Sequence, residues 1–272
     1  MFYQKIAQLI DDAYNETSLE SEKFPRKEQV SNFIFDVQKL FFPTFFGEPC
    51  KGKTTKQALV TVANDLEEIL NTVYGSECGL SQELTEKFVQ RLPDVRRILG
   101  RDLVAFYEGD PAAKTKEEIV LCYPGFYAVM LYRTAHELFL LQVPFLPRMI
   151  TETAHGRTGI DIHPGATIGE YFFIDHGTGI VVGETTVIGN RVRLYQGVTL
   201  GAKSFRLDED GNPVKGGKRH PTIGNNVIIY ANATILGGKT VVGDGCVIGG
   251  NVWLTESVNA GEIVHYSPKE KA

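Results

Sequence analysis

Histidines and carboxylates are the groups in this sequence best suited to proton transfer. The six histidines are at least eight residues apart: His136, His155, His163, His176, His220 and His265. Protein zinc sites commonly take two ligands from a short Cys/His motif, and the sequence has no such motif. It therefore predicts no metal site.

His176 has the most suggestive surroundings of the six. It follows Asp175 directly, and Asp161 precedes it by fifteen residues. A neutral histidine whose second ring nitrogen bonds a carboxylate is a good general base near neutral pH. A lone histidine is more often held by the backbone for structural reasons. The neighbouring carboxylates and His220, which flanks a polar loop, favour the catalytic interpretation.

A six-residue repeat indicates how these residues are positioned. A helix has no such period, and short repeats of this kind are typical of a parallel β-helix, in which three short faces close one coil. We expect about four coils with the repeated residues pointing inward. The repeated positions are Ile162, Ile168, Ile174, Ile180, Thr186, Val192 and Val198, then Ile223, Ile229, Ile235, Val241, Val247 and Trp253.

The repeat is interrupted between Leu200 and Pro221 by a stretch rich in glycine and charge, GAKSFRLDEDGNPVKGGKRH. Long irregular segments inside compact domains are usually functional or disordered. We expect a loop expelled from one coil, with its two ends, Ala202-Lys203 and Lys218-Arg219-His220, close together on the coil wall.

Residues 1–155 show helical spacing of apolar residues, as in Ile6 to Tyr14 and Val30 to Leu40. Pro93 predicts the end of one helix near Leu92 and the start of another. We expect six or seven helices here. The predicted regions are a helical domain at 1–155, a β-helix at 156–258 with its loop at 201–221, and a C-terminal tail at 259–272.

Composition narrows the function. The net charge of −5 argues against bulk binding to nucleic acid or an anionic membrane. No apolar run is long enough for a membrane span, and the acidic N-terminus does not fit a signal peptide. The four cysteines are Cys50, Cys78, Cys122 and Cys246, far apart and without a CxxC motif, which is typical of a reducing cytoplasm.

Three segments resemble the serine acetyltransferase family: IDIHPGATIGEYFFIDHGTGIVVGETTVIG from Ile160, VTLGA from Val198, and GKRHPTIG from Gly217. GDPAA at Gly109 to Ala113 also matches, and the resemblance is strong over about residues 105–255. It implies a left-handed parallel β-helix. It also implies an enzyme that transfers an acetyl group from acetyl-CoA to the hydroxyl of L-serine, giving O-acetyl-L-serine for cysteine biosynthesis.

The resemblance also implies residue roles. His176 would be the general base and Asp161 its partner. An ideal coil would not stack these two, so an irregular first coil is required. His220 would lie near the developing oxyanion. The residues expected to hold the serine ammonium and carboxylate groups are Asp110, Asp175 and Arg219.

Acetyl-CoA is expected as a co-substrate, with no bound cofactor. The resemblance implies contacts to it from the backbone of Ala202, Ala231 and Gly249. Lys203, with Lys215 and Lys218, could meet its phosphates or serve only loop solubility. The sequence has no GxSxG motif and no cysteine beside a paired histidine, so it gives no sign of an acyl-enzyme intermediate.

A homotrimer or a dimer of trimers is expected, cytoplasmic, with active sites between neighbouring β-helices. The sequence ends Ser-Pro-Lys-Glu-Lys-Ala instead of the isoleucine common in the family, so we do not expect the usual complex with O-acetylserine sulfhydrylase. Two alternatives stay open: an acetyltransferase for another hydroxyl acceptor, such as a sugar, and a catalytically silent scaffold.

Overall fold

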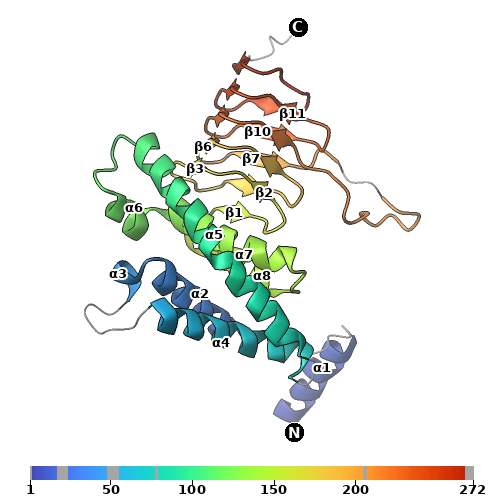
Figure 1. Ribbon diagram of the computed structural model, residues 1–272. Coiled ribbons are helices and arrows are strands. Elements are labelled where there is room, and N and C mark those ends of the chain that lie inside the picture. The colour runs from blue at the N-terminus through green and yellow to red at the C-terminus, as the bar shows by residue number, and fades with distance from the viewer. Residues whose placement is uncertain (1, 17–23, 48–54, 77–78, 205–206, 267–272) are drawn as a thin grey trace.

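The computed structural model describes residues 2–16, 24–47, 55–76, 79–204 and 207–266. Cys50, Cys78 and the chain end at 267–272 lie outside the described residues. Helices form the first part of the chain and short strands the second (Figure 1). The predicted order of a helical region followed by a parallel β-helix is confirmed.

Eight helices occur in the described part of the chain, against the six or seven expected. Among those residues, no helix is both long and apolar enough to cross a membrane. The helices are α1 (Phe2–Glu16), α2 (Lys27–Phe41), α3 (Pro43–Phe46), α4 (Thr55–Tyr74), α5 (Leu80–Gly109), α6 (Lys116–Cys122), α7 (Pro124–Leu140) and α8 (Leu146–Thr158).

The break predicted at Pro93 is wrong, because α5 continues through it. A proline inside a helix costs roughly 3 kcal/mol, since it removes one hydrogen bond and crowds the preceding turn. Apolar residues on both sides of Pro93 are buried, including Phe88, Leu92, Val95 and Leu99. Burial of this continuous apolar stripe offsets the cost, and the resulting long helix crosses beside the first coils (Figure 1).

In the described part of the chain, fourteen short strands wind into three parallel sheets. Sheet A has the order β1-β4-β7-β10-β13, sheet B has β11-β8-β5-β2, and sheet C has β14-β12-β9-β6-β3. The strands are β1 (Asp161–Ile162), β2 (Thr167–Ile168), β3 (Phe173–Ile174), β4 (Val181–Val182), β5 (Val187–Ile188), β6 (Arg193–Leu194), β7 (Thr199–Gly201), β8 (Thr222–Ile223), β9 (Ile228–Ile229), β10 (Thr234–Leu236), β11 (Val241–Val242), β12 (Val247–Ile248), β13 (Trp253–Leu254) and β14 (Ile263–Val264).

The predicted inward positions are correct in parts of the repeat and wrong in others. Val241 and Trp253 are 45% and 70% exposed, whereas the next residue, Val242, is fully buried. Thr234 pairs with Trp253, whereas Val181 in the second coil pairs with Thr199. The later coil is therefore one residue longer than the second coil, and the repeat position that points inward changes after Gly237. Ile180 is buried as expected, but it lies just before β4. The residue of β4 itself that points inward is Val182.

The first coil is irregular, as the resemblance required. Asp161 pairs with Val181, whereas Val181 pairs with Thr199, so the first coil is two residues longer than the second. The extra length lies in the turn from sheet C to sheet A, where His176, Gly177 and Gly179 all have positive φ. Glycine adopts such angles without steric cost, and other residues do so rarely.

A loop leaves the stack after β7, and Thr199 pairs with Thr234 across it. Its two ends lie together on the wall, with Lys203 beside Gly237 and the Lys218 carbonyl beside Gly238. Figure 1 shows the loop projecting from the stack. The last strand, β14, pairs with β12, so the coils extend beyond residue 258 into the segment predicted as a tail.

A ladder of polar side chains joins the turns from sheet B to sheet C. The Oδ1 of Asn190 accepts the N–H of Glu170 at 2.8 Å, and that of Asn225 accepts the N–H of Asn190 at 2.9 Å. Asp244 in turn accepts the N–H of Asn225 at 2.7 Å. Each coil thus satisfies backbone donors of the coil that precedes it.

A buried ion pair joins the helices to the first coil. The guanidinium of Arg133 on α7 donates from Nε to Asp102 of α5 at 3.1 Å. It also donates to the carbonyl groups of Ile168 and Gly169. Asp102 accepts the N–H of Phe172 at 2.9 Å. Both side chains are almost completely buried, so these bonds replace lost hydration.

Replacing Arg133 with methionine should lower the free energy of unfolding by about 3–5 kcal/mol, because Asp102 would stay buried without its partner. Urea denaturation measures the change. Arg97→Met is the matched control, because Arg97 forms exposed ion pairs with Asp94 and Glu170, and it should leave stability nearly unchanged. An unaltered midpoint for Arg133→Met would contradict this role.

Candidate active site

His176 occupies the irregular turn that leads from β3 to β4. Its side chain is 72% exposed, and its Nε2 lies 3.8 Å from Oδ1 of Asp175. Its φ of 56° is unusual for a residue with a side chain. Seven other described residues with side chains share a positive φ, among them Tyr171 and Arg191 at other turns of the coils. The turn therefore presents an accessible imidazole beside a carboxylate.

Asp110 caps the end of α5 and faces the same region. Its Oδ2 accepts the hydroxyl of Tyr123 at 2.6 Å, and its Oδ1 accepts the N–H of Ala112 at 2.8 Å. The hydrogen bond to Asp110 raises the pKa of Tyr123 well above its usual value. Burial, with the negative charges of Asp175 and Asp110, also raises the pKa of Tyr195. Both carboxylates thus act on the same hydroxyl groups.

A second group of polar residues surrounds the returning end of the loop, at the turns from sheet A to sheet B. The guanidinium of Arg219 donates to Glu184. Thr185 Oγ1 accepts the backbone N–H groups of Arg219 and His220 at 3.0 and 3.1 Å. Burial alone would raise the pKa of Glu184, but Arg219 holds it below its usual value.

The imidazole of His220 is fixed and neutral. Its Nδ1 accepts the backbone N–H of Thr185 at 3.0 Å, which assigns the ring proton to Nε2. Burial, with the positive charge of Arg219, lowers its pKa to about 4. The ring lies against Gly183, where an added Cβ would be 2.2 Å from Nε2. Gly183 therefore leaves the space that the imidazole occupies.

The two groups occupy opposite edges of sheet A within one chain. His176, Asp175 and Asp110 belong to the edge shared with sheet C, and Arg219 and His220 to the edge shared with sheet B. Among the described residues, no hydrogen bond or ion pair connects the two groups. The residues expected to contact acetyl-CoA divide in the same way: Ala231 and Gly249 at the first edge, Ala202 and Lys203 at the second.

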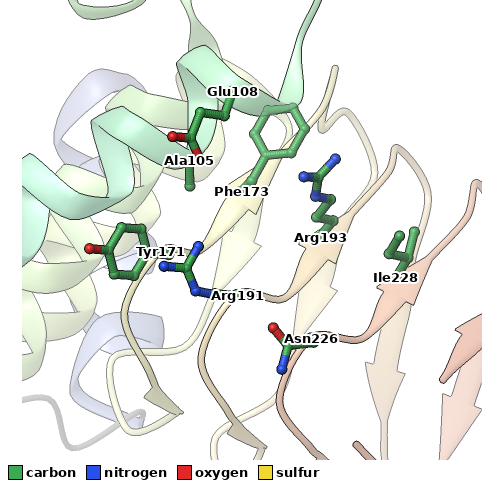
Figure 2. A pocket seen from close by; sticks show the side chains of 8 residues that line it. All are labelled: Ala105, Glu108, Tyr171, Phe173, Arg191, Arg193, Asn226 and Ile228. Atoms are coloured by element: carbon green, nitrogen blue, oxygen red, sulfur yellow. The ribbon is translucent and has the colours of Figure 1, made fainter. Parts of the chain in front are cut away.

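A separate cavity of about 390 Å³ opens beside the end of α5, against the outer face of sheet C (Figure 2). Its lining includes Glu108, Tyr171, Arg191 and Arg193. None of the residues predicted for the site lines it.

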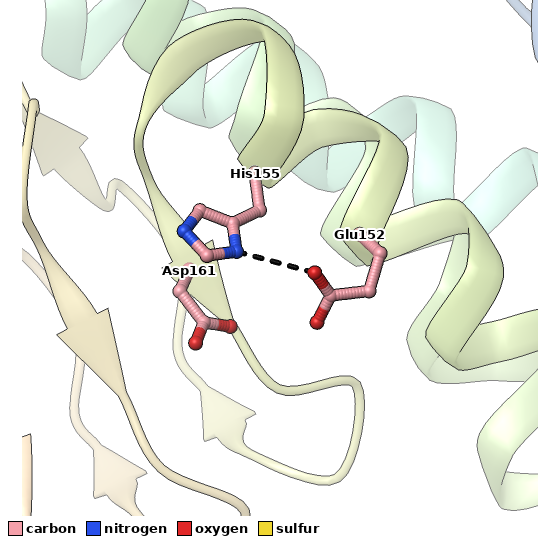
Figure 3. Close-up of side chains that lie close together, drawn as sticks. All are labelled: Glu152, His155 and Asp161. Atoms are coloured by element: carbon pink, nitrogen blue, oxygen red, sulfur yellow. Dashed lines mark hydrogen bonds and ion pairs between the residues drawn. The ribbon is translucent and has the colours of Figure 1, made fainter.

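Asp161 lies on β1 and contacts α8. Its Oδ1 is 3.6 Å from Nη2 of Arg148. Its carboxylate also groups with Glu152 and His155, with ligand atoms within 4.8 Å of one another (Figure 3). His155 Nδ1 is 3.2 Å from Glu152 Oε2. No hydrogen bond links Asp161 to His176 in the described part of the chain, so the predicted pairing of these two stays a prediction.

Sequence reasoning did not single out Glu184, Thr185 or Tyr123. Glu184 and Thr185 lie within the VVGET segment that carries the resemblance, so the motif held a signal for them. Their contacts with Arg219 and His220 depend on how two coils stack across the loop. For Tyr123 the local sequence offers no signal, since it is one of many aromatics near α7.

Folding lowers the pKa of His220 from 6.5 to about 4. As pH falls, the His220 imidazole therefore takes up a proton in the unfolded chain at a higher pH than in the folded protein. The free energy of unfolding should therefore decrease between about pH 6.5 and pH 4 and lose no more from this group below that. Comparing urea denaturation of the wild type and His220→Gln isolates the contribution. Identical pH dependence in both proteins would refute it.

No family model matches the chain, but individual proteins do. The chain is 46% identical over 261 residues to "Serine acetyltransferase, plasmid" of Synechococcus elongatus, covering 88% of this chain and 81% of that protein. It is 44% identical over 163 residues to the serine acetyltransferase of Helicobacter pylori strain 26695, covering 60% of this chain and 90% of that one.

Solved structures agree. Serine acetyltransferase 1 of Entamoeba histolytica in complex with L-cysteine superposes with a TM-score of 0.80 at 35% identity, covering 93% of this chain and 95% of that one. The Neisseria gonorrhoeae serine acetyltransferase in complex with serine gives 0.60 at 28% identity, covering 88% and 97%. The predicted fold class, a helical region followed by a left-handed parallel β-helix, is confirmed. The chain is 46% identical to the Synechococcus elongatus protein over 88% of its length, and 35% identical to the Entamoeba histolytica structure over 93%. It therefore belongs to the serine acetyltransferase family.

Proposed function

We propose that this protein transfers the acetyl group of acetyl-CoA to the hydroxyl of L-serine, with His176 as the general base. The observation that carries the proposal is an exposed imidazole, 3.8 Å from Asp175, on a strained turn of a serine acetyltransferase fold. The serine hydroxyl loses its proton to His176 as its oxygen attacks the thioester carbonyl. The tetrahedral intermediate then collapses to O-acetyl-L-serine as its C–S bond breaks, and the proton on His176 passes to the sulfur, so that CoA leaves as the thiol.

Asp110 and Asp175 are suited to the serine ammonium group. The pKa of Tyr195 is raised first by burial and then by the negative charges of Asp175 and Asp110. Both charges therefore act near the same edge of sheet A. Asp110 keeps its orientation through the hydroxyl of Tyr123. An ammonium group between the two would place the serine hydroxyl near the turn that holds His176.

Arg219 and His220 are suited to the opposite charge. The guanidinium of Arg219 uses Nη2 for Glu184 and retains other N–H groups for the serine carboxylate. His220 presents a neutral Nε2–H, because its Nδ1 already accepts an N–H. A fixed donor of this kind stabilises the oxyanion that forms as serine attacks the thioester. Positioning of the two substrates supplies much of the remaining acceleration.

Asp161 remains our proposed partner of His176. The imidazolium formed during attack would attract a carboxylate, and Asp161 lies on the strand that pairs with β4, which follows the turn of His176. Its present contact is Arg148, at 3.6 Å. The catalytic arrangement therefore requires the Asp161 side chain to turn away from α8.

A trimer would complete the site. One chain holds its two polar groups at opposite edges of sheet A, so the group around His176 needs the loop-side edge of a neighbouring chain. The acetyl-CoA contacts divide between the same edges, which suits an extended pantetheine arm lying between two stacks. Whether two trimers pair, and the cytoplasmic location, stay predictions.

His176→Ala should lower the rate of CoA release from acetyl-CoA and L-serine by roughly 100-fold or more, the usual contribution of a general base. A thiol reagent measures the release. Wild-type release that depends on a sugar instead of serine would favour the alternative acceptor. Equal rates for variant and wild type would remove His176 as the base.

Gly183→Ala should reduce kcat by about 100-fold, because the new Cβ would lie 2.1–2.2 Å from atoms of the His220 ring and displace its Nε2–H. The matched control is Gly217→Ala in the loop, where a Cβ meets nothing within 4 Å. The control should keep wild-type kcat. A fully active Gly183→Ala would argue against a role for His220 in the oxyanion site.

A further inference from the structure

The cavity beside α5 lies apart from the residues assigned to acetyl transfer. The end of α5 covers one side, with Glu108 at the rim (Figure 2). The other side is the outer face of sheet C, where Phe173, Arg193 and Ile228 stand on three successive strands. Arg191 and Tyr171 reach it from the turns between sheets B and C.

The two arginines of this cavity lack a carboxylate partner among the described residues. Arg191 lies over the ring of Tyr171, with its Cζ 4.1 Å from the ring centroid. Arginines nearby are paired differently: Arg97 and Arg101 both bind Glu170. Neither guanidinium group forms a hydrogen bond within the described residues, so both offer N–H donors to a ligand in this cavity.

The lining defines the class of ligand. Guanidinium groups bind carboxylates and phosphates in two-pronged geometry. The ring of Phe173 and the side chain of Ile228 add an apolar wall. Glu108 leaves the cavity with one net positive charge. These features fit a small organic anion with a short apolar body.

Residues that line the cavity contact α5 directly beside the proposed serine site. The Phe173 ring packs edge-on against Phe106 of α5, with centroids 5.0 Å apart. It also touches Gly109, where a Cβ would be 2.7 Å from the ring. Gly109 directly precedes Asp110, and Phe173 is two residues before Asp175. A ligand bridging α5 and sheet C would fix the two carboxylates relative to each other.

We propose that this cavity binds a small organic anion and that binding strengthens serine binding at the adjacent site. The binding half stands on the cavity alone, whereas the kinetic half rests on the proposed function.

The test uses the full-length protein, with succinate and inorganic phosphate as probes in calorimetric titrations at constant ionic strength. Succinate should bind with a Kd of about 1 mM or tighter. Arg191→Gln/Arg193→Gln should weaken binding at least about 10-fold, and Glu108→Gln should strengthen it. Arg97→Gln is the matched control, because Arg97 pairs with Glu170 outside the cavity, and should bind like the wild type. Tighter binding of phosphate than succinate would identify a phosphate-bearing ligand as the better fit.

Saturating succinate should also lower the serine KM of the wild type by about 5-fold, the size of a typical coupling between sites. The double arginine variant should keep wild-type kcat and lose this effect. Undiminished succinate affinity in that variant would overturn the site, and an unchanged serine KM would overturn the link to it. A wild type that releases no CoA with serine would instead count against acetyl transfer.

Discussion

The buried contact between Arg133 and Asp102 connects three parts of the molecule, which also meet through apolar packing and through more exposed ion pairs such as Arg91–Glu137 and Arg97–Glu170. It joins α7 to α5, and both helices to the carbonyl groups at the start and an N–H group at the end of the first B–C turn. Apolar surfaces can slide, but charge-assisted hydrogen bonds have a defined geometry. Together with the packing of Phe106 against Phe173, the pair holds α5 against the first coil and so helps to set the position of Asp110, which ends the helix.

The repeat was sufficient to predict coils but insufficient to predict their frame. Ile162, Ile168 and Ile174 point inward as expected, whereas Trp253 does not. A period reports the average length of a face, and single-residue changes at a turn alter the frame without altering the average. Glycine allowed such changes after Ile174 and near Gly237. In α5, apolar burial on both sides of Pro93 outweighed a local signal.

The candidate site was predictable to the extent that its residues lie in short motifs. His176 and Asp175 are consecutive in one such segment, and Arg219 and His220 in another, so the proximity within each pair follows from the sequence itself. Their supporting contacts were not predictable. Thr185 meets His220 across thirty-five residues because an expelled loop returns to the same wall. The separation of the two pairs at opposite edges of one sheet likewise arises from winding, which no local pattern records.

The ladder of Asn190, Asn225 and Asp244 has a direction, since each side chain accepts an N–H from the coil before it. During synthesis, a coil leaves the ribosome before the side chain that will bond its turn has emerged. When the coils form in order from the N-terminal end, the last coil formed always has an N–H group in its B–C turn that still lacks its side-chain acceptor. Each new coil completes the one below it, and the growing end of the nascent chain always carries an unfinished turn.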